Sequence, residues 1–192
     1  MKSLFTHLLV VSALSVFAQK KDTILLLPGS KDLQTDRLNN YTSSYNLYSV
    51  KDGEEKLVGS LDDYLSMNTK TGEALRICKI QFGPNSILDS GLCKLKGLVP
   101  IFHRSVQTKK TLNLAFVKNK VTGEIIFKNE TGPKSEKIDH ESPSPLFDSY
   151  YEDIIAKTIN LKLGAVFKFG EYIYEKGGTV WSCGEVAKEI LA

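Results

Sequence analysis

Residues 141–178 read ESPSPLFDSYYEDIIAKTINLKLGAVFKFGEYIYEKGG, and this stretch decides the fold that the rest of the chain must build. It contains the one convincing helix pattern, a proline-rich entry to that helix and a strand that leaves it. Ser142 and Ser144 each precede a proline, which disfavours the helical conformation and predicts an extended entry. Because the segments before residue 141 carry strand patterns, we expect a β-rich protein with one helix.

The helix is predicted over residues 149–160. Ser149 and Glu152 have the spacing of a capping box, and Asp148 is the other candidate for the cap. The residues that follow at helical spacing form one mostly apolar face and are Tyr151, Ile154, Ile155, Thr158 and Ile159. Such a stripe needs an apolar surface to cover, and the predicted sheet is the surface that the chain offers.

Short strand-like runs recur between Tyr41 and Lys128, at a spacing of about 8–12 residues that is typical of an antiparallel sandwich or barrel. Asp52-Gly53 between two such runs is a strong hairpin signal. Within 111–117, Leu112, Leu114 and Phe116 share one face of the predicted strand and Asn113 takes the other, which indicates one buried face and one wet face.

Two regions are expected after residue 18, and the second of them contains a long loop. Residues 19–40 are an N-terminal arm, within which 24–27 are either a short first strand or a packed extension. Residues 41–192 form a single β-rich domain, since the length suits one core. Residues 129–145 are rich in Lys, Glu, Ser, Pro and Gly, so we expect a mobile surface loop there.

Residues 1–18 have the three parts of a secretory signal peptide: Lys2, a mostly apolar run, and small residues that allow cleavage after Ala18. The apolar run is shorter than the ~20 residues that a membrane span needs. We therefore expect an exported protein, periplasmic or extracellular, with no membrane span in its mature form.

The composition is that of an ordinary globular protein, with 42% hydrophobic and 24% charged residues. The net charge is +3, and loss of Lys2 with the signal leaves +2. The lysines are scattered along the chain, which argues against a nucleic-acid-binding patch.

Three cysteines, Cys78, Cys93 and Cys183, would meet an oxidising compartment after export. A hairpin that turns at 83–85 would bring Cys78 near Cys93, so a disulfide between them is a candidate, with three free buried thiols as the alternative. The cysteines and histidines lack the spacing of metal ligands, and no metal or cofactor is expected.

Sequence motifs of catalysis are missing: there is no G-x-S-x-G, no Walker loop, no H-E-x-x-H and no Gly-rich dinucleotide turn. His103 falls in a predicted strand and His140 in the predicted loop, and neither is expected to be catalytic. We therefore expect a protein that is not an enzyme.

A cavity between the helix and the sheet would be lined by apolar and aromatic residues of the helix and of the strands after it. The candidates are Tyr151, Ile154, Ile155, Phe167, Phe169, Tyr172, Tyr174 and Trp181. Filling of the core by the same side chains is the alternative.

Several stretches resemble a known family. These are Leu98-Val-Pro-Ile-Phe-His-Arg-Ser105, Thr111-Leu-Asn-Leu-Ala-Phe116, Lys120-Val-Thr-Gly123, Phe147-Asp-Ser149 and Tyr172-x-Tyr-Glu-Lys-Gly-Gly178. They resemble domain-of-unknown-function family 3108 of exported Gram-negative proteins, which is similar in architecture to periplasmic lipoprotein-carrier half-barrels. The resemblance covers about residues 37–181. It implies a curved antiparallel sheet, a half-barrel or open barrel, with one amphipathic helix on its concave face, and it assigns no catalytic residues.

The resemblance also implies further strands after Trp181, whereas residues 184–192 have the pattern of a short helix or tail. A sheet without those strands would keep an open edge, which invites pairing with another chain. The leading hypothesis is a non-enzymatic binding domain for an apolar or lipid-like ligand. The alternatives are an envelope structural or interaction module that uses an open sheet edge and, least favoured, a hydrolase.

Overall fold

A computed structural model describes residues 23–129, 132–160, 162 and 164–185 of the chain. The predicted signal peptide, residues 1–18, lies outside the described residues, and so do residues 186–192. Within the described ranges, no helix is long and apolar enough to cross a membrane.

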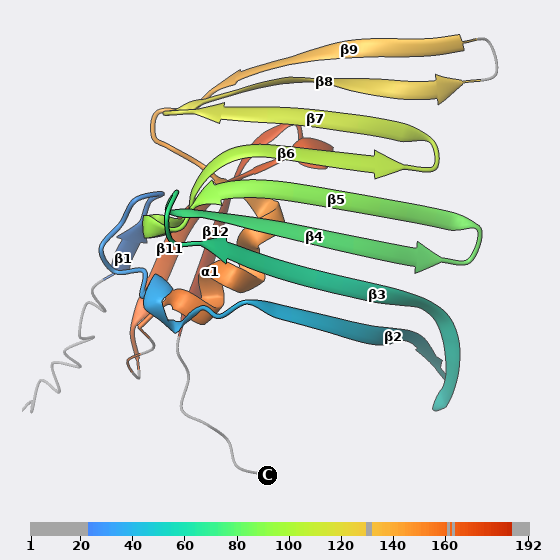
Figure 1. The fold of residues 1–192 in the computed structure, drawn as a ribbon, viewed down its shortest axis with the longest axis horizontal. Helices are drawn as coiled ribbons and strands as arrows, with labels where there is room; N and C mark the ends of the chain where they lie inside the picture. Colours follow the sequence, from blue (N-terminus) through green and yellow to red (C-terminus); the bar gives the residue numbers. More distant parts are fainter. Residues whose placement is uncertain (1–22, 130–131, 161, 163, 186–192) are drawn as a thin grey trace, which may run out of the picture.

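A large antiparallel sheet of eight strands forms most of the molecule, and its strands lie in chain order from β2 to β9 (Figure 1). The strands are β2 (Tyr41–Lys51), β3 (Glu54–Asn68), β4 (Glu73–Phe82), β5 (Asn85–Lys94), β6 (Val99–Gln107), β7 (Lys110–Val117), β8 (Lys120–Asn129) and β9 (Gly132–Glu141). Asp52 and Gly53 both have positive φ, 53° and 84°, as the predicted hairpin between β2 and β3 requires. The prediction of a mainly β fold with a large antiparallel sheet is confirmed.

A smaller sheet packs beside the large one. It consists of β1 (Thr23–Leu26), β10 (Phe147–Asp148), β11 (Val166–Ile173) and β12 (Gly178–Glu185). The central strand β11 pairs in parallel with β1 and β10 and antiparallel with β12. Part of the predicted N-terminal arm is therefore a strand of the fold.

The helix begins where the sequence predicts it and ends slightly earlier. A 3-10 turn, η3 (Ser149–Tyr151), leads into α1 (Glu152–Thr158). Of the two candidate caps, Asp148 is the one that acts, because its side chain accepts a hydrogen bond from the backbone N–H of Tyr150. Short 3-10 turns also occur as η1 (Thr35–Arg37), η2 (Lys96–Leu98) and η4 (Tyr174–Lys176).

The apolar stripe of α1 packs against one half of the large sheet. Ile154 and Ile155 are fully buried in a core cluster that contains Leu65, Ala74 and Cys93 of the large sheet. Figure 1 shows α1 and the small sheet against one end of the large sheet, whose strands continue beyond them. We call the face of the large sheet that α1 covers the inner face.

The prediction of a mobile loop over residues 129–145 is wrong for most of that segment. Residues 132–141 form β9, which pairs with β8 along its whole length. In this edge strand only Gly132, Ile138 and His140 are half-buried, and the other residues are exposed. Because both faces are largely in contact with water, the sequence carries charged residues rather than an apolar alternation. Charges of this kind protect an edge strand from pairing with another chain.

Candidate functional site

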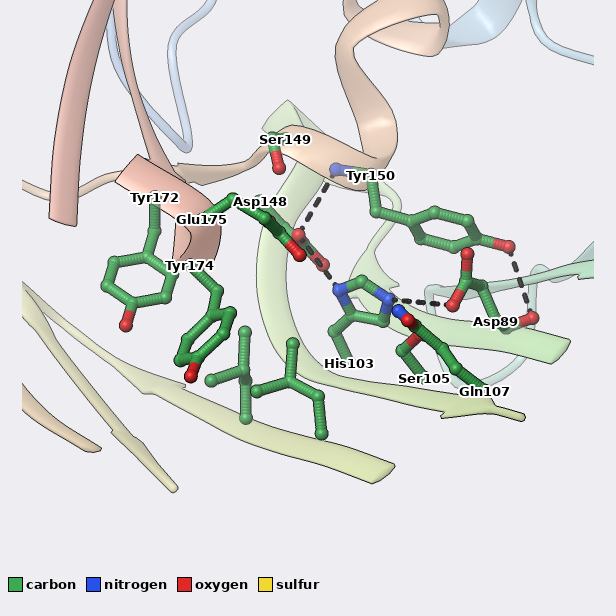
Figure 2. Close-up of a pocket in the computed structure, with 12 residues that line it drawn as sticks. Asp89, His103, Ser105, Gln107, Asp148, Ser149, Tyr150, Tyr172, Tyr174 and Glu175 are labelled. Atoms are coloured by element: carbon green, nitrogen blue, oxygen red, sulfur yellow. Dashed lines mark hydrogen bonds and ion pairs between the residues drawn. The ribbon is translucent and has the colours of Figure 1, made fainter. Parts of the chain in front are cut away.

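A pocket of about 210 Å³ opens on the inner face between β5–β7, the start of the helical segment and η4. Its polar lining includes Asp89, His103, Gln107 and Asp148, and three tyrosines, Tyr150, Tyr172 and Tyr174, complete most of the wall (Figure 2). We call this cavity the His103 pocket.

His103 lies between two carboxylates, as Figure 2 shows. Its Nδ1 is 3.2 Å from Oδ1 of Asp148, and its Nε2 is 3.7 Å from Oδ1 of Asp89. The side chain of Asp148 is 2% exposed and that of His103 is 11% exposed. The first contact is a hydrogen bond, whereas the second is too long for one.

The register of the large sheet explains this convergence. His103 of β6 stands opposite Gly91 of β5, and Asp89 points to the same face two residues along β5. The Tyr150 ring stacks on the imidazole with a centroid distance of 4.7 Å and an interplanar angle of 18°. Gly91 makes room for this contact, because a Cβ at that position would lie 2.8 Å from Cδ1 of Tyr150.

The two carboxylates control the charge of His103. Burial alone lowers the pKa of His103, but Asp148 and Asp89 outweigh it and raise that pKa to about 10. The imidazole is therefore protonated at neutral pH, and both ring nitrogens are hydrogen-bond donors. A protonated histidine cannot accept a proton as a general base.

Three buried atoms of the pocket have no hydrogen-bond partner among the described residues. They are Oδ1 of Asp89, Nε2 of His103 and Oδ2 of Asp148. Buried polar atoms in this state are costly unless water or a ligand supplies the missing bond. The pocket thus offers two acceptors and one donor.

A second polar cluster lies next to the pocket and ties the helix to the sheet. Nε and Nη2 of Arg76 donate to the two carboxylate oxygens of Asp63 at 3.0 and 2.9 Å. Nη1 of Arg76 also donates to Asp153 of α1 at 2.6 Å and to the carbonyl of Tyr150 at 2.7 Å. Burial raises the pKa of Asp63, but hydrogen bonds from Arg76, Cys78 and the Tyr41 hydroxyl hold that pKa below its usual value.

An uncovered apolar surface continues along the inner face beyond the pocket. Four apolar residues on β2 to β5 lie directly opposite one another, each on the next strand. We call them the apolar row, and they are Tyr45, Leu61, Ile80 and Ile87. Tyr45 is 52% exposed and the other three are partly exposed. Phe82, on the same face one step further out, is 53% exposed.

The structure divides the predicted cavity residues into three groups. Tyr151, Ile154, Ile155, Phe167 and Phe169 are core residues. Their side chains fill the space between α1 and the sheet, so the prediction of a cavity there is wrong for them.

The other predicted cavity residues lie elsewhere. Tyr172 and Tyr174 do line a cavity, but it is the His103 pocket, which lies beside η3 rather than beneath α1. Trp181 is 41% exposed on β12, where Nζ of Lys168 lies 4.8 Å from its ring centroid.

The predicted disulfide is also wrong. Cys78 and Cys93 are both buried free thiols. Cys78 stands opposite Asp89 and Cys93 opposite Ala74, so the two positions are four residues apart along the strands. Four residues correspond to about 13 Å, well beyond the ~7 Å between Cα atoms that a disulfide tolerates.

No motif in the sequence marks Asp89 or Asp148 as a partner of His103. The pattern around Asp148 predicts only a helix cap, a role that it does have. The pairing of residue 89 with residue 105 across β5 and β6 can be predicted from the strand register. The position of Asp148 near His103 cannot, because it depends on the path of residues 142–147 over the sheet. Cys183 is exposed on β12 and does not belong to the pocket lining.

His140 is in a strand rather than in a loop. It belongs to β9, and its Nε2 lies 2.8 Å from Oγ1 of Thr179. Within the described ranges of the chain, no group of His, Cys, Asp and Glu side chains has the arrangement of a metal site.

Comparison with known proteins gives one match. The model of a family described as a protein of unknown function (DUF3108) matches residues 40–191. No curated protein matches the chain, and no solved structure matches it.

Proposed function

The chain belongs to the DUF3108 family of proteins of unknown function, and we propose that it is an exported, non-enzymatic domain that binds an apolar or lipid-like ligand. The ligand lies on the inner face of the large sheet, beside α1 rather than beneath it. The observation that carries this proposal is the apolar row, which α1 leaves uncovered.

The apolar row has the properties of a binding surface. Tyr45 and Phe82 are large and more than half exposed, and they flank partly exposed Leu61 and Ile80 on the same face. Isolated exposed apolar residues are normal on a protein surface, whereas contiguous ones mark sites of contact with a ligand or partner. The row crosses four adjacent strands, and this length suits an extended hydrocarbon chain.

Two further arguments support a binding role without catalysis and outside the cytoplasm. The protonated state of His103 removes the one histidine of the pocket from general-base chemistry. Export rests on the signal-peptide pattern of residues 1–18. Fractionation of cells that express the full chain tests export, since the protein should be found in the periplasm or the medium and shortened by 18 residues.

Native mass spectrometry after gentle purification tests ligand binding, together with titration of a neutral fluorescent probe, N-phenyl-1-naphthylamine. We expect a co-purified apolar compound or saturable binding of the probe. An empty protein that also ignores the probe contradicts the proposal.

A pair of variants tests where the ligand lies. Phe82→Ser changes the inner face, and Leu88→Ser changes a residue of similar exposure, 46%, that points to the opposite face of the sheet. We expect Phe82→Ser to bind the probe more weakly than the wild type and Leu88→Ser to bind it with unchanged affinity. The reverse result would place the ligand on the outer face.

A second candidate function is an envelope interaction module. Strand β2 has eleven residues and, in the described part of the chain, pairs on one side only, with β3. Unlike β9, it carries few charges, so its free edge could accept a strand of another protein. Pull-down from envelope extract separates the two functions: a stable protein partner that is lost on substitution of Ser44 by Pro favours the interaction module.

A further inference from the structure

We propose that the His103 pocket binds the polar end of the ligand, and that this end is an uncharged head group that carries hydroxyls. This inference rests on the proposed function, because it names the chemistry of the ligand that the inner face would hold.

The pocket and the apolar row are continuous. Ile87, the last member of the row, stands directly opposite Gln107, which lines the pocket. Asp89, another lining residue, follows two positions later on the same face of β5, a distance of about 7 Å. A molecule with an apolar chain on the row can therefore place its polar end in the pocket.

The atoms without partners define what the polar end must supply. Oδ2 of Asp148 and Oδ1 of Asp89 need donors, and Nε2 of His103 needs an acceptor. The side chain of Asp148 is almost completely buried, so bulk water does not reach it freely. A hydroxyl both donates and accepts, and one placed between Nε2 and Asp89 would bridge the 3.7 Å separation that is too long for a direct bond.

The lining disfavours the other common head groups, anions by charge and an ammonium by its lack of an acceptor. A carboxylate or phosphate would meet the carboxylates of Asp89 and Asp148, with Glu175 also in the lining. An ammonium cannot accept a hydrogen bond from Nε2 of protonated His103. Two of the three pocket tyrosines already have a cation near the ring, since Arg76 lies 5.1 Å from the centroid of Tyr150 and Nζ of Lys110 lies 5.0 Å from that of Tyr174.

The size of the pocket agrees with a head group alone. Its volume of about 210 Å³ is below the range of about 300–1,000 Å³ that is typical of sites enclosing a whole drug-sized ligand. A glycerol-sized group fits such a space, and the rest of the molecule would lie outside it, on the apolar row.

The test compares four compounds with the same twelve-carbon chain and different heads. Glycerol monolaurate, lauric acid, dodecyl phosphate and dodecylamine each compete with N-phenyl-1-naphthylamine below their micellar concentrations. Because a site with buried polar groups discriminates against ligands that leave those groups unpaired, we expect glycerol monolaurate to compete at concentrations about tenfold lower than the others.

A variant pair locates the selectivity. Asp89→Asn should abolish most of the preference for glycerol monolaurate. Asp62→Asn changes an exposed carboxylate on the outer face of β3 and should leave the preference unchanged. Equal competition by all four compounds, or a preference for a charged head, overturns the inference and leaves the proposed function standing. If neither the probe nor any of the compounds binds, both fail.

Discussion

Nδ1 of His103 lies 3.2 Å from Oδ1 of Asp148, across 45 positions of the sequence, and this hydrogen bond joins the large sheet to the start of the helical segment. The same carboxylate oxygen accepts the backbone N–H of Tyr150 at 3.2 Å. One buried carboxylate therefore holds both the imidazole and the first helical turn, so the charge of His103 affects the stability of the fold as well as the pocket.

The first prediction concerns stability at mildly alkaline pH. The pKa of His103 is about 10 in the folded protein, above the ~6.5 of an unfolded histidine. A raised pKa of this kind contributes stability that is fully present below pH ~6.5 and is lost as the pH rises towards 10. The free energy of unfolding should therefore fall between pH 7 and pH 8.5, by up to about 1.4 kcal/mol per pH unit.

Urea denaturation at several pH values measures this slope, and His103→Gln is the control. The variant keeps a polar side chain but does not titrate, so its stability should vary less over the same range. Tyrosines do not titrate in this range, and the thiols of the unfolded chain titrate equally in both proteins, so the difference between the two slopes reports on His103. Equal slopes in the two proteins would show that His103 is not the responsible group.

The second prediction concerns Arg76. Arg76→Met removes the guanidinium and leaves Asp63, whose side chain is 7% exposed, as a buried unpaired charge. Loss of one partner of a buried pair destabilises a protein by about 3–5 kcal/mol, so we expect a decrease of that order in the free energy of unfolding. The double variant Arg76→Met/Asp63→Asn should recover part of the loss.

Lys94→Met is the matched control for Arg76→Met. Lys94 also pairs with a carboxylate on the adjacent strand, because its Nζ lies 2.7 Å from Oε1 of Glu73, but the side chain of Lys94 is 52% exposed. Exposed pairs contribute little because water screens them. Chemical denaturation should therefore show almost no change, and a loss as large as that of Arg76→Met would refute the special role of the buried cluster.

The third prediction concerns the close approach of the helical segment to the sheet. In Gly91→Ala the new Cβ would lie 2.8 Å from Tyr150 and 2.9 Å from Tyr151, so both rings must move. Overpacking of this kind costs about 1–3 kcal/mol, and it should also weaken ligand binding because Tyr150 lines the pocket.

Gly184→Ala in β12 provides the comparison, since a Cβ there meets no atom within 4 Å. Thermal unfolding of both variants separates local crowding from the general effect of replacing glycine in a strand. A similar change in the two proteins would mean that the contact with the tyrosines is not the cause.

The parts of the fold that the sequence predicts depend on local signals. The hairpin at Asp52-Gly53 needs positive φ at adjacent residues, and the stripe from Tyr151 to Ile159 needs only helical spacing. The edge strand β9 escaped prediction because neither of its faces is buried enough to impose an apolar alternation. Backbone hydrogen bonds to β8 hold β9 in the sheet, and amino-acid composition gives no information on such pairing.

The His103 pocket was less accessible to prediction, because its groups come from distant segments. His103 and Asp89 are on adjacent strands, but Asp148 reaches them only after the chain crosses the inner face. The prediction of a cavity beneath α1 was wrong for a related reason. An apolar stripe indicates that one face of the helix is covered, but it does not indicate whether side chains or a ligand cover that face.

The fourth prediction distinguishes the three cysteines. Burial raises the pKa of Cys78 to about 11 and that of Cys93 to about 12, whereas Cys183 is exposed. Because the thiolate is the reactive form, a thiol reagent at pH 8 should modify one cysteine rapidly in the folded protein and all three after denaturation. In Cys183→Ser the rapid phase should disappear while two slow sites remain. Fewer than three reactive thiols in the denatured, unreduced wild type would instead reveal a disulfide, which the register of β4 and β5 does not allow between Cys78 and Cys93.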